Sequence, residues 1–138
     1  MTRRTRSLAP VPTVISFIDC INRGDLDGLG RLMADNHRLQ VLDENPLVGR
    51  SANIEAWRGY FDSFPHYVIY PHVIVDEVFG VAVLGHTTGS HLGLPDDAEA
   101  KILVIWQAYV AGGFLRSWSV IEDTPEARAQ VGLPPDAA

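Results

Sequence analysis

The chain has 138 residues, of which 46% are hydrophobic and 20% charged, and its formal net charge is -6. This size and composition predict one globular domain over residues 1–138, with a flexible tail over residues 1–9. The acidic balance argues against nucleic-acid binding, which needs a concentrated basic surface; only Arg3, Arg4 and Arg6 form a basic cluster.

The N-terminal third raises the question of export or membrane insertion. The apolar run at residues 11–21 is interrupted by Asp19 and has no small-x-small cleavage site, which argues against a signal peptide. No apolar run approaches the ~20 residues that span a bilayer. Cys20 is the only cysteine, so no intramolecular disulfide can form. We therefore expect a cytoplasmic protein without membrane contact, in which Cys20 is a packing residue.

The first half of the chain has mainly helical periodicity. Pro12 suits the first turn of a helix whose apolar residues recur every three or four positions, and Gly24 ends this helix. Asp25 can cap a short second helix. The period changes to two from His37 to Asp43, which predicts a strand. A third helix, with a broad aromatic face, is predicted from residue 51 to residue 64.

The second half of the chain is predicted to form strands. Thr124 and Pro125 mark the cap and first residue of a short closing helix. Helices first and strands afterwards predict an α+β fold. We expect a cone-shaped α+β barrel in which three N-terminal helices pack on a curved, mainly antiparallel sheet around a cavity. Its β-branched and aromatic strands would cover residues 67–75, 79–92, 101–110 and 114–121.

Two stretches give the chain a resemblance to a known superfamily. INRGDLDGLGRLMADN (residues 21–36) closes the first two helices, and LDENPLVGRSANIEAW (residues 42–57) covers the strand end, the turn and the third helix. With them, nearly the whole chain resembles the nuclear transport factor 2-like superfamily. FDSFPHY (residues 61–67), GSHLG (residues 89–93) and the strand with Trp118 resemble its polyketide cyclase, or SnoaL-like, branch. Members include steroid isomerases, epoxide hydrolases, cyclases, dehydratases and association modules, so the resemblance implies a fold more than a function.

The first helices resemble those of steroid isomerases, but the functional positions do not. The resemblance places the isomerase oxyanion tyrosine at Phe17, the catalytic base at Val41 and the protonated acid at Ile105. None of these side chains can donate or accept a proton, which argues against the steroid-isomerase mechanism.

The acid that the cyclase branch would use is also missing. There a His-Trp-Asp sequence on the last strand supplies the base, whereas this chain has Ser117, Trp118 and Ser119. Glu122, three residues after Ser119, keeps an acidic position in that strand.

Asp43 is the candidate general base. It lies two residues beyond Val41, hence on the same strand face, which would point it toward the expected cavity. A carboxylate desolvated by Trp57, Tyr60 or Phe61 would have its pKa raised toward the working range of a base. The competing interpretation is that Asp43 ends the strand and caps the turn that follows.

His91 is the second catalytic candidate, as a proton donor, with Tyr60 as the alternative donor. The competing interpretation makes His91 an exposed or dimer-facing residue. His86, five residues earlier, falls on the opposite face unless a bulge intervenes. His37 shares a face with Asp43, but six extended residues separate them by roughly 20 Å, too far for a direct pair. We expect His37 near the start of its strand, partly exposed.

The cavity is expected to be mostly apolar with a few polar anchors, as in small-molecule sites. We predict a small-molecule-binding protein for a compact apolar or aromatic ligand. If it is an enzyme, it would catalyse proton transfer of the isomerase, cyclase or dehydratase type. The same side chains could equally fill a closed core. The expected ligand-binding residues are Phe17, Val41, Trp57, Tyr60, Phe61, Ile105, Gln107 and Ser119.

No motif indicates a metal or a cofactor, and we expect neither. The five histidines and single cysteine show no metal-ligand spacing, and there is no phosphate-binding loop or nucleophile motif. The alternative function is a non-catalytic module that forms a homodimer through its sheet. Its basis is a set of large apolar residues that parity could place on an outer face: Val68, Tyr70, Ile74, Trp106, Trp118 and Val120.

Overall fold

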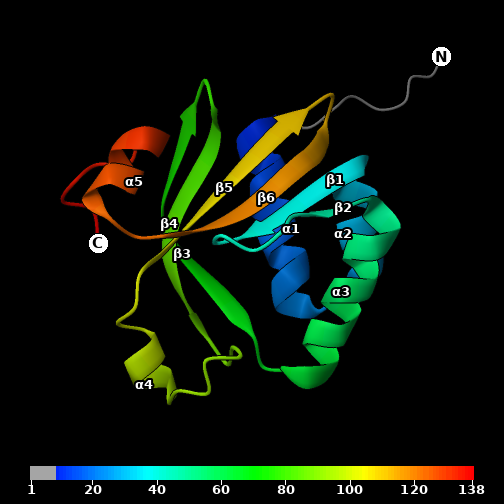
Figure 1. The fold of residues 1–138 in the computed structure, drawn as a ribbon, viewed down its shortest axis with the longest axis horizontal. Coiled ribbons are helices and arrows are strands. Elements are labelled where there is room, and N and C mark those ends of the chain that lie inside the picture. The colour runs from blue at the N-terminus through cyan, green and yellow to red at the C-terminus, as the bar shows by residue number, and fades with distance from the viewer. Residues whose placement is uncertain (1–8) are drawn as a thin grey trace.

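The computed structural model describes residues 9–138, with five helices and six strands in this part of the chain (Figure 1). The expected tail over residues 1–9, with its arginine cluster, lies outside the described residues except for Ala9. The helices are α1 (Pro10–Arg23), α2 (Leu26–Leu32), α3 (Arg50–Ser63), α4 (Asp96–Glu99) and α5 (Pro125–Val131). The strands are β1 (Met33–Val41), β2 (Leu47–Val48), β3 (Val68–Glu77), β4 (Gly80–Thr88), β5 (Val104–Ala111) and β6 (Phe114–Glu122).

All six strands belong to one mixed sheet with the order β2-β1-β6-β5-β4-β3. Only β1 and β6 run parallel, with Leu39 beside Trp118, and every other neighbouring pair is antiparallel. The predicted α+β class and the mainly antiparallel sheet are therefore confirmed. Because β2 and β3 are the two edges, the hydrogen-bonded sheet does not close into the expected barrel.

Helices cover the sheet on both faces, with α1, α2 and α3 on one side and α5 on the other (Figure 1). Successive residues of a strand point to opposite faces, and the core follows this rule. Val83 and Trp106 pack in the cluster with α1, whereas Leu84 and Ile105 pack in the cluster with α5. This alternation decides which side chains can reach a site between the sheet and α3.

Helix α1 is the centre of the larger core. Phe17 is fully buried, and its ring centroid lies 5.0 Å from that of Trp118 and 5.9 Å from that of His37. Asn22 fixes the helix to the sheet, because its side-chain amide donates to the carbonyl of Ile69 and accepts from the Ile69 N–H. Cys20 is buried, as expected for a packing residue, and burial raises the pKa of its thiol.

Strand β1 begins and ends earlier than the sequence predicts. Met33 already has extended backbone dihedrals (φ -79, ψ 138), so α2 ends at Leu32. The predicted strand from His37 to Asp43 is therefore wrong at its end, since β1 stops at Val41 and Asp43 lies in the following turn.

The partly exposed position expected for His37 is also wrong. His37 lies in the middle of β1 and is 0% exposed. Its Nδ1 donates to the carbonyl of Leu115 at 2.9 Å, so the neutral ring carries its proton there. Burial lowers the pKa of His37 below its ordinary value, because charging the ring without solvent is unfavourable.

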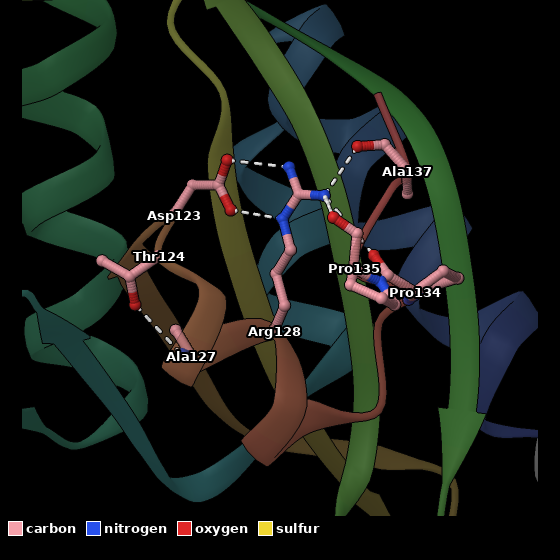
Figure 2. Close-up of polar contacts among 7 residues, drawn as sticks. All are labelled: Asp123, Thr124, Ala127, Arg128, Pro134, Pro135 and Ala137. Carbon is pink, nitrogen blue, oxygen red and sulfur yellow. Dashed lines mark hydrogen bonds and ion pairs between the residues drawn. The ribbon is translucent and has the colours of Figure 1, made fainter.

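Helix α5 is held on the sheet by Arg128 (Figure 2), and its start is capped by Thr124, whose hydroxyl accepts from the Ala127 N–H as predicted. The Arg128 guanidinium, only 8% exposed as a residue, donates to both carboxylate oxygens of Asp123 at 2.7 and 2.9 Å. Its remaining Nη1 donates to the carbonyls of Pro134, Pro135 and Ala137. One side chain therefore joins the end of β6, α5 and the C-terminal residues.

We predict that Arg128→Lys lowers the free energy of unfolding by about 2 kcal/mol, because a lysine cannot reproduce the two-pronged bond to Asp123 or all the carbonyl contacts. Urea denaturation measures this loss. Arg116→Lys, the same change at an exposed residue of β6, serves as the control and should stay within about 0.5 kcal/mol of wild type. Equal stability of the two variants would contradict the proposed role of Arg128.

We predict that the free energy of unfolding falls as the pH drops below about 6.5. The reason is that the pKa of His37 is lower in the folded chain, so His37 binds a proton more readily in the unfolded chain. His37→Asn should remove part of this slope, since an amide can donate to Leu115 and does not titrate. Denaturant unfolding between about pH 5 and 7.5 measures it. His86, whose pKa is also lowered, leaves a residual slope. The control is His66→Asn, the same change at an exposed histidine, which should keep the full pH dependence. An equally full pH dependence in His37→Asn would contradict the role of His37.

Candidate functional site

A cleft of about 610 Å³ lies between the sheet and α3. Alternate residues of the central strands form one wall, which includes Val104 and Trp106 of β5 and Trp118 and Val120 of β6. Glu122, two residues further along β6, lines the same wall and is the only carboxylate among the described lining residues. The cleft is thus apolar over most of its sheet wall, with one acid at its end.

Helix α3 and the segment that follows β4 form the other walls. α3 presents Ala56, Trp57 and Tyr60, while Tyr67 lies just before β3. Trp57 and Tyr60 meet edge to face, with ring centroids 6.1 Å apart and planes at 82°. Three exposed aliphatic residues from three segments also line the cleft: Leu42 (54% exposed), Leu92 (49%) and Ile102 (43%).

Four of the residues predicted from the sequence line this cleft, namely Val41, Trp57, Tyr60 and His91. Phe17 and Phe61 do not; both pack in the core cluster that the cleft overlies. The placement of Phe17 and Phe61 in the lining is therefore a correction, because the Phe17 ring packs against Trp118 and His37 and the Phe61 ring against Trp57 within that cluster.

The expected cavity positions of Ile105, Gln107 and Ser119 are wrong. The sequence comparison with isomerases set the parity of β5 so that Ile105 faced the cavity. In the structure Ile105 packs with α5 on the opposite face, and Gln107 pairs with Ser119 on that same face. A shift of one residue moves every side chain of a strand to the other face, which explains why all three fail together.

Asp43 does not line the cleft. It lies in the turn that follows β1 and is not among the lining residues. The role of Asp43 as a cavity base is corrected accordingly. The physical reason is the early end of β1: Leu42 has a left-handed backbone (φ 50), which breaks the strand parity on which that role depended.

Tyr60 and His91 form the most specific polar contact of the cleft. The Tyr60 hydroxyl lies 2.8 Å from Nδ1 of His91 and accepts the backbone N–H of His91 at 3.2 Å. In the tautomer that carries the His91 ring proton on Nε2, Nδ1 accepts the hydroxyl proton of Tyr60. Burial raises the pKa of Tyr60, while the His91 N–H opposes the shift and Glu99 adds to it.

Gly89 sets the position of His91. It has a left-handed backbone (φ 68) and lies so close to the His66 carbonyl that a side chain would clash, so β4 turns away after Thr88. His91 therefore reaches α3. His86 stays in β4, where its Nδ1 lies 2.7 Å from Nε2 of His72 and its ring stacks on that of Tyr70.

Glu99 is a residue of this site that the sequence does not predict. This residue is 1% exposed, accepts a hydrogen bond from the Thr87 hydroxyl, and lies 3.4 Å from the donating N–H of Ser90. Thr87 and Ser90 both line the cleft, so Glu99 stands directly behind its polar end. It belongs to a run of three acids within four residues, which looks like a solvated loop, and no sequence pattern singles out the one that α4 turns inward.

The described residues contain neither a metal site nor a membrane-spanning helix. Between residues 9 and 138, no group of three or more His, Cys, Asp or Glu side chains is placed to hold a metal ion. No helix in the same range is both long and apolar enough to cross a bilayer.

Comparison with known proteins agrees with this architecture. The SnoaL-like domain family matches residues 14–117, and no curated protein matches the chain. A candidate polyketide cyclase from Sinorhizobium meliloti superposes with a TM-score of 0.66 and 17% identity, covering 79% of this chain and 93% of that chain. IdmH, a candidate polyketide cyclase from Streptomyces antibioticus, gives 0.64 and 20%, covering 91% and 100%.

A third structure is SalBIII, an epoxide hydrolase/cyclase-like enzyme of pyran ring formation in the polyether salinomycin. It superposes with a TM-score of 0.68 and 16% identity, covering 83% of this chain and 91% of that chain. At such identities these structures show that the fold is shared.

We predict that Tyr60→Phe exposes the backbone N–H of His91 to solvent exchange, because its acceptor oxygen is removed. One lost hydrogen bond corresponds to an exchange rate about two- to tenfold higher. Hydrogen exchange followed by NMR measures the rate at this amide. Tyr109→Phe, the same change at an exposed residue of β5, should leave it unaltered. An unchanged rate in Tyr60→Phe would show that the contact does not hold the segment.

Proposed function

The chain belongs to the SnoaL-like domain family of the nuclear transport factor 2-like superfamily, and on that basis we propose that it is a small-molecule enzyme with proton-transfer chemistry. Its cleft would hold one compact, mainly apolar or aromatic ligand. The reaction would be an isomerisation, cyclisation or dehydration, in which one group removes a proton from carbon and another stabilises charge on oxygen.

The size and lining of the cleft support a small-molecule ligand. A volume of about 610 Å³ lies within the range of roughly 300–1,000 Å³ that small-molecule sites occupy. The walls carry the rings of Trp57, Tyr60, Tyr67, Trp106 and Trp118, which offer flat apolar surfaces.

The polar groups of the cleft support proton transfer. Glu122 is the carboxylate of the lining and replaces Asp43 as the proposed base. His91, whose ring contacts the Tyr60 hydroxyl through Nδ1, is the proposed donor to a ligand oxygen through Nε2. The observation that carries the proposal is this oriented Tyr60–His91 pair at the side of an apolar cleft.

The non-catalytic homodimer stays a prediction with weaker support. Trp106 and Trp118 are each 1% exposed within one chain, so they cannot form an outer face. Val120 lines the cleft. Of the six residues behind that prediction, Tyr70 has the most exposed position, at 42%.

We predict that the protein accelerates the ring opening of 5-nitrobenzisoxazole, a flat, uncharged carbon acid. The base takes the ring C–H proton, the N–O bond breaks, and a coloured cyanophenolate forms. Glu122→Gln should lower kcat/KM by about 10²-fold or more, because the amide cannot accept that proton. His91→Gln should lower it less, since the donor only assists the leaving oxygen.

The control is Glu126→Gln, the same change in an exposed acid of α5 on the other side of the sheet. It should keep the wild-type rate. Saturable turnover that survives Glu122→Gln would remove Glu122 as the base. Absence of both turnover and binding of the probe would contradict the proposal as a whole.

A further inference from the structure

The charges around the cleft have one sign. Among the described residues that line it, the ionisable side chains are Tyr60, Tyr67, His91 and Glu122, and no lysine or arginine contributes. Lys101 neighbours the lining residue Ile102 in sequence, but it is exposed and lies outside the lining. A ligand in the cleft thus meets one carboxylate and no permanent positive charge from residues 9–138.

Glu99 adds a second negative charge behind the wall. Its carboxylate is bound by two neutral donors, Thr87 and the N–H of Ser90, and no ion pair joins it to a cation in the described part of the chain. A buried charge without a counter-ion acts over a longer range than one in water, because the surrounding protein screens it poorly.

The effect of Glu99 reaches the aromatic wall. Burial is the largest cause of the raised pKa of Tyr60 and of Tyr67, and the negative charge of Glu99 contributes to both. Both tyrosines resist the anionic form for the same reason that an anionic ligand between them would be disfavoured.

Arginine side chains gather at a second groove, outside the cleft. Arg31, Arg50 and Arg58 surround a separate groove between α2 and α3. Arg50 and Arg58 pair with Asp35 and Glu55 at 3.3 and 3.4 Å. Three guanidinium groups thus lie at the groove between α2 and α3, and none of residues 9–138 brings one into the lining of the cleft.

We propose that the cleft selects its ligand by charge, accepting uncharged and cationic aromatic-sized molecules and rejecting the carboxylates of the same shape. The inference rests on the proposed function, since it specifies the substrate class of that site. An anion would lose its hydration in an apolar cleft, find no lysine or arginine among the lining residues that the structure describes, and face Glu122 and Glu99. A cation would instead meet aromatic faces and a carboxylate.

Three naphthalene probes of nearly equal shape test the proposal: 2-naphthylmethanol, 2-naphthylmethylamine and 2-naphthoate. At about pH 7.5 they are neutral, cationic and anionic respectively. Binding is followed by isothermal titration calorimetry. We expect the carboxylate to bind at least about 30-fold more weakly than the alcohol, and the amine at least as tightly as the alcohol. A carboxylate that binds within threefold of the alcohol would overturn the inference.

Matched variants separate the cleft charges from the net charge. Glu122→Gln and Glu99→Gln should each narrow the gap between alcohol and carboxylate by about threefold or more. Asp97→Asn makes the same charge change at an exposed residue of α4 and should leave the gap unaltered. Equal narrowing in all three variants would mean that the net charge, not the cleft, repels the anion.

A gain-of-function variant covers the case in which Glu99→Gln does not fold. Ile102 is 43% exposed and lines the cleft, so Ile102→Arg can place a guanidinium there without entering the core. It should raise the affinity for 2-naphthoate above that for the alcohol. If the wild-type protein binds the alcohol and the carboxylate with similar affinity, charge selection is refuted but the small-molecule site is not. Failure of all three probes to bind would refute the small-molecule site, and charge selection with it.

Discussion

The cleft depends on how the Asn53 side chain holds α3 against the sheet. Asn53 is 0% exposed, and its Nδ2 lies 3.2, 3.1 and 2.9 Å from the carbonyl oxygens of His37, Leu47 and Gly49. One amide thus joins the middle of β1, strand β2 and the start of α3. Since α3 carries Trp57 and Tyr60, this interaction sets the distance between the aromatic wall and the sheet.

Much of the fold could be predicted from the sequence, because its signals are local. Gly24 ends α1 with a left-handed backbone, Asp25 caps α2 by accepting the Gly28 N–H, and Thr124 caps α5. The site is harder to predict from the sequence, because it depends on which face of the sheet each strand residue points to and on single backbone dihedral angles. The left-handed Leu42 removed Asp43 from the cleft, and the turned-in Glu99 had no pattern to distinguish it from its neighbours.

The parity of β6 explains how the acid of the site could have been found. Trp118, Val120 and Glu122 alternate along one face, and all three line the cleft. Glu122 is an acid of that strand in the sequence, but a cavity position for Ile105 implies the opposite strand parity. An apolar run that ends in a single acid on the core face is therefore the sequence pattern that indicates this residue. Whether such a cleft acts on a ligand depends on that acid and on the oriented His91, and the shared fold does not supply either.

The central claim is that the cleft between α3 and the sheet is the binding site, and NMR contacts to a bound ligand test it most directly. With 2-naphthylmethanol, nuclear Overhauser effects should connect the ligand ring to the indole protons of Trp57, Trp106 and Trp118, which all line the cleft. Contacts confined to Ile54 in the arginine-lined groove, or to Tyr70 on the other face of the sheet, would contradict the account.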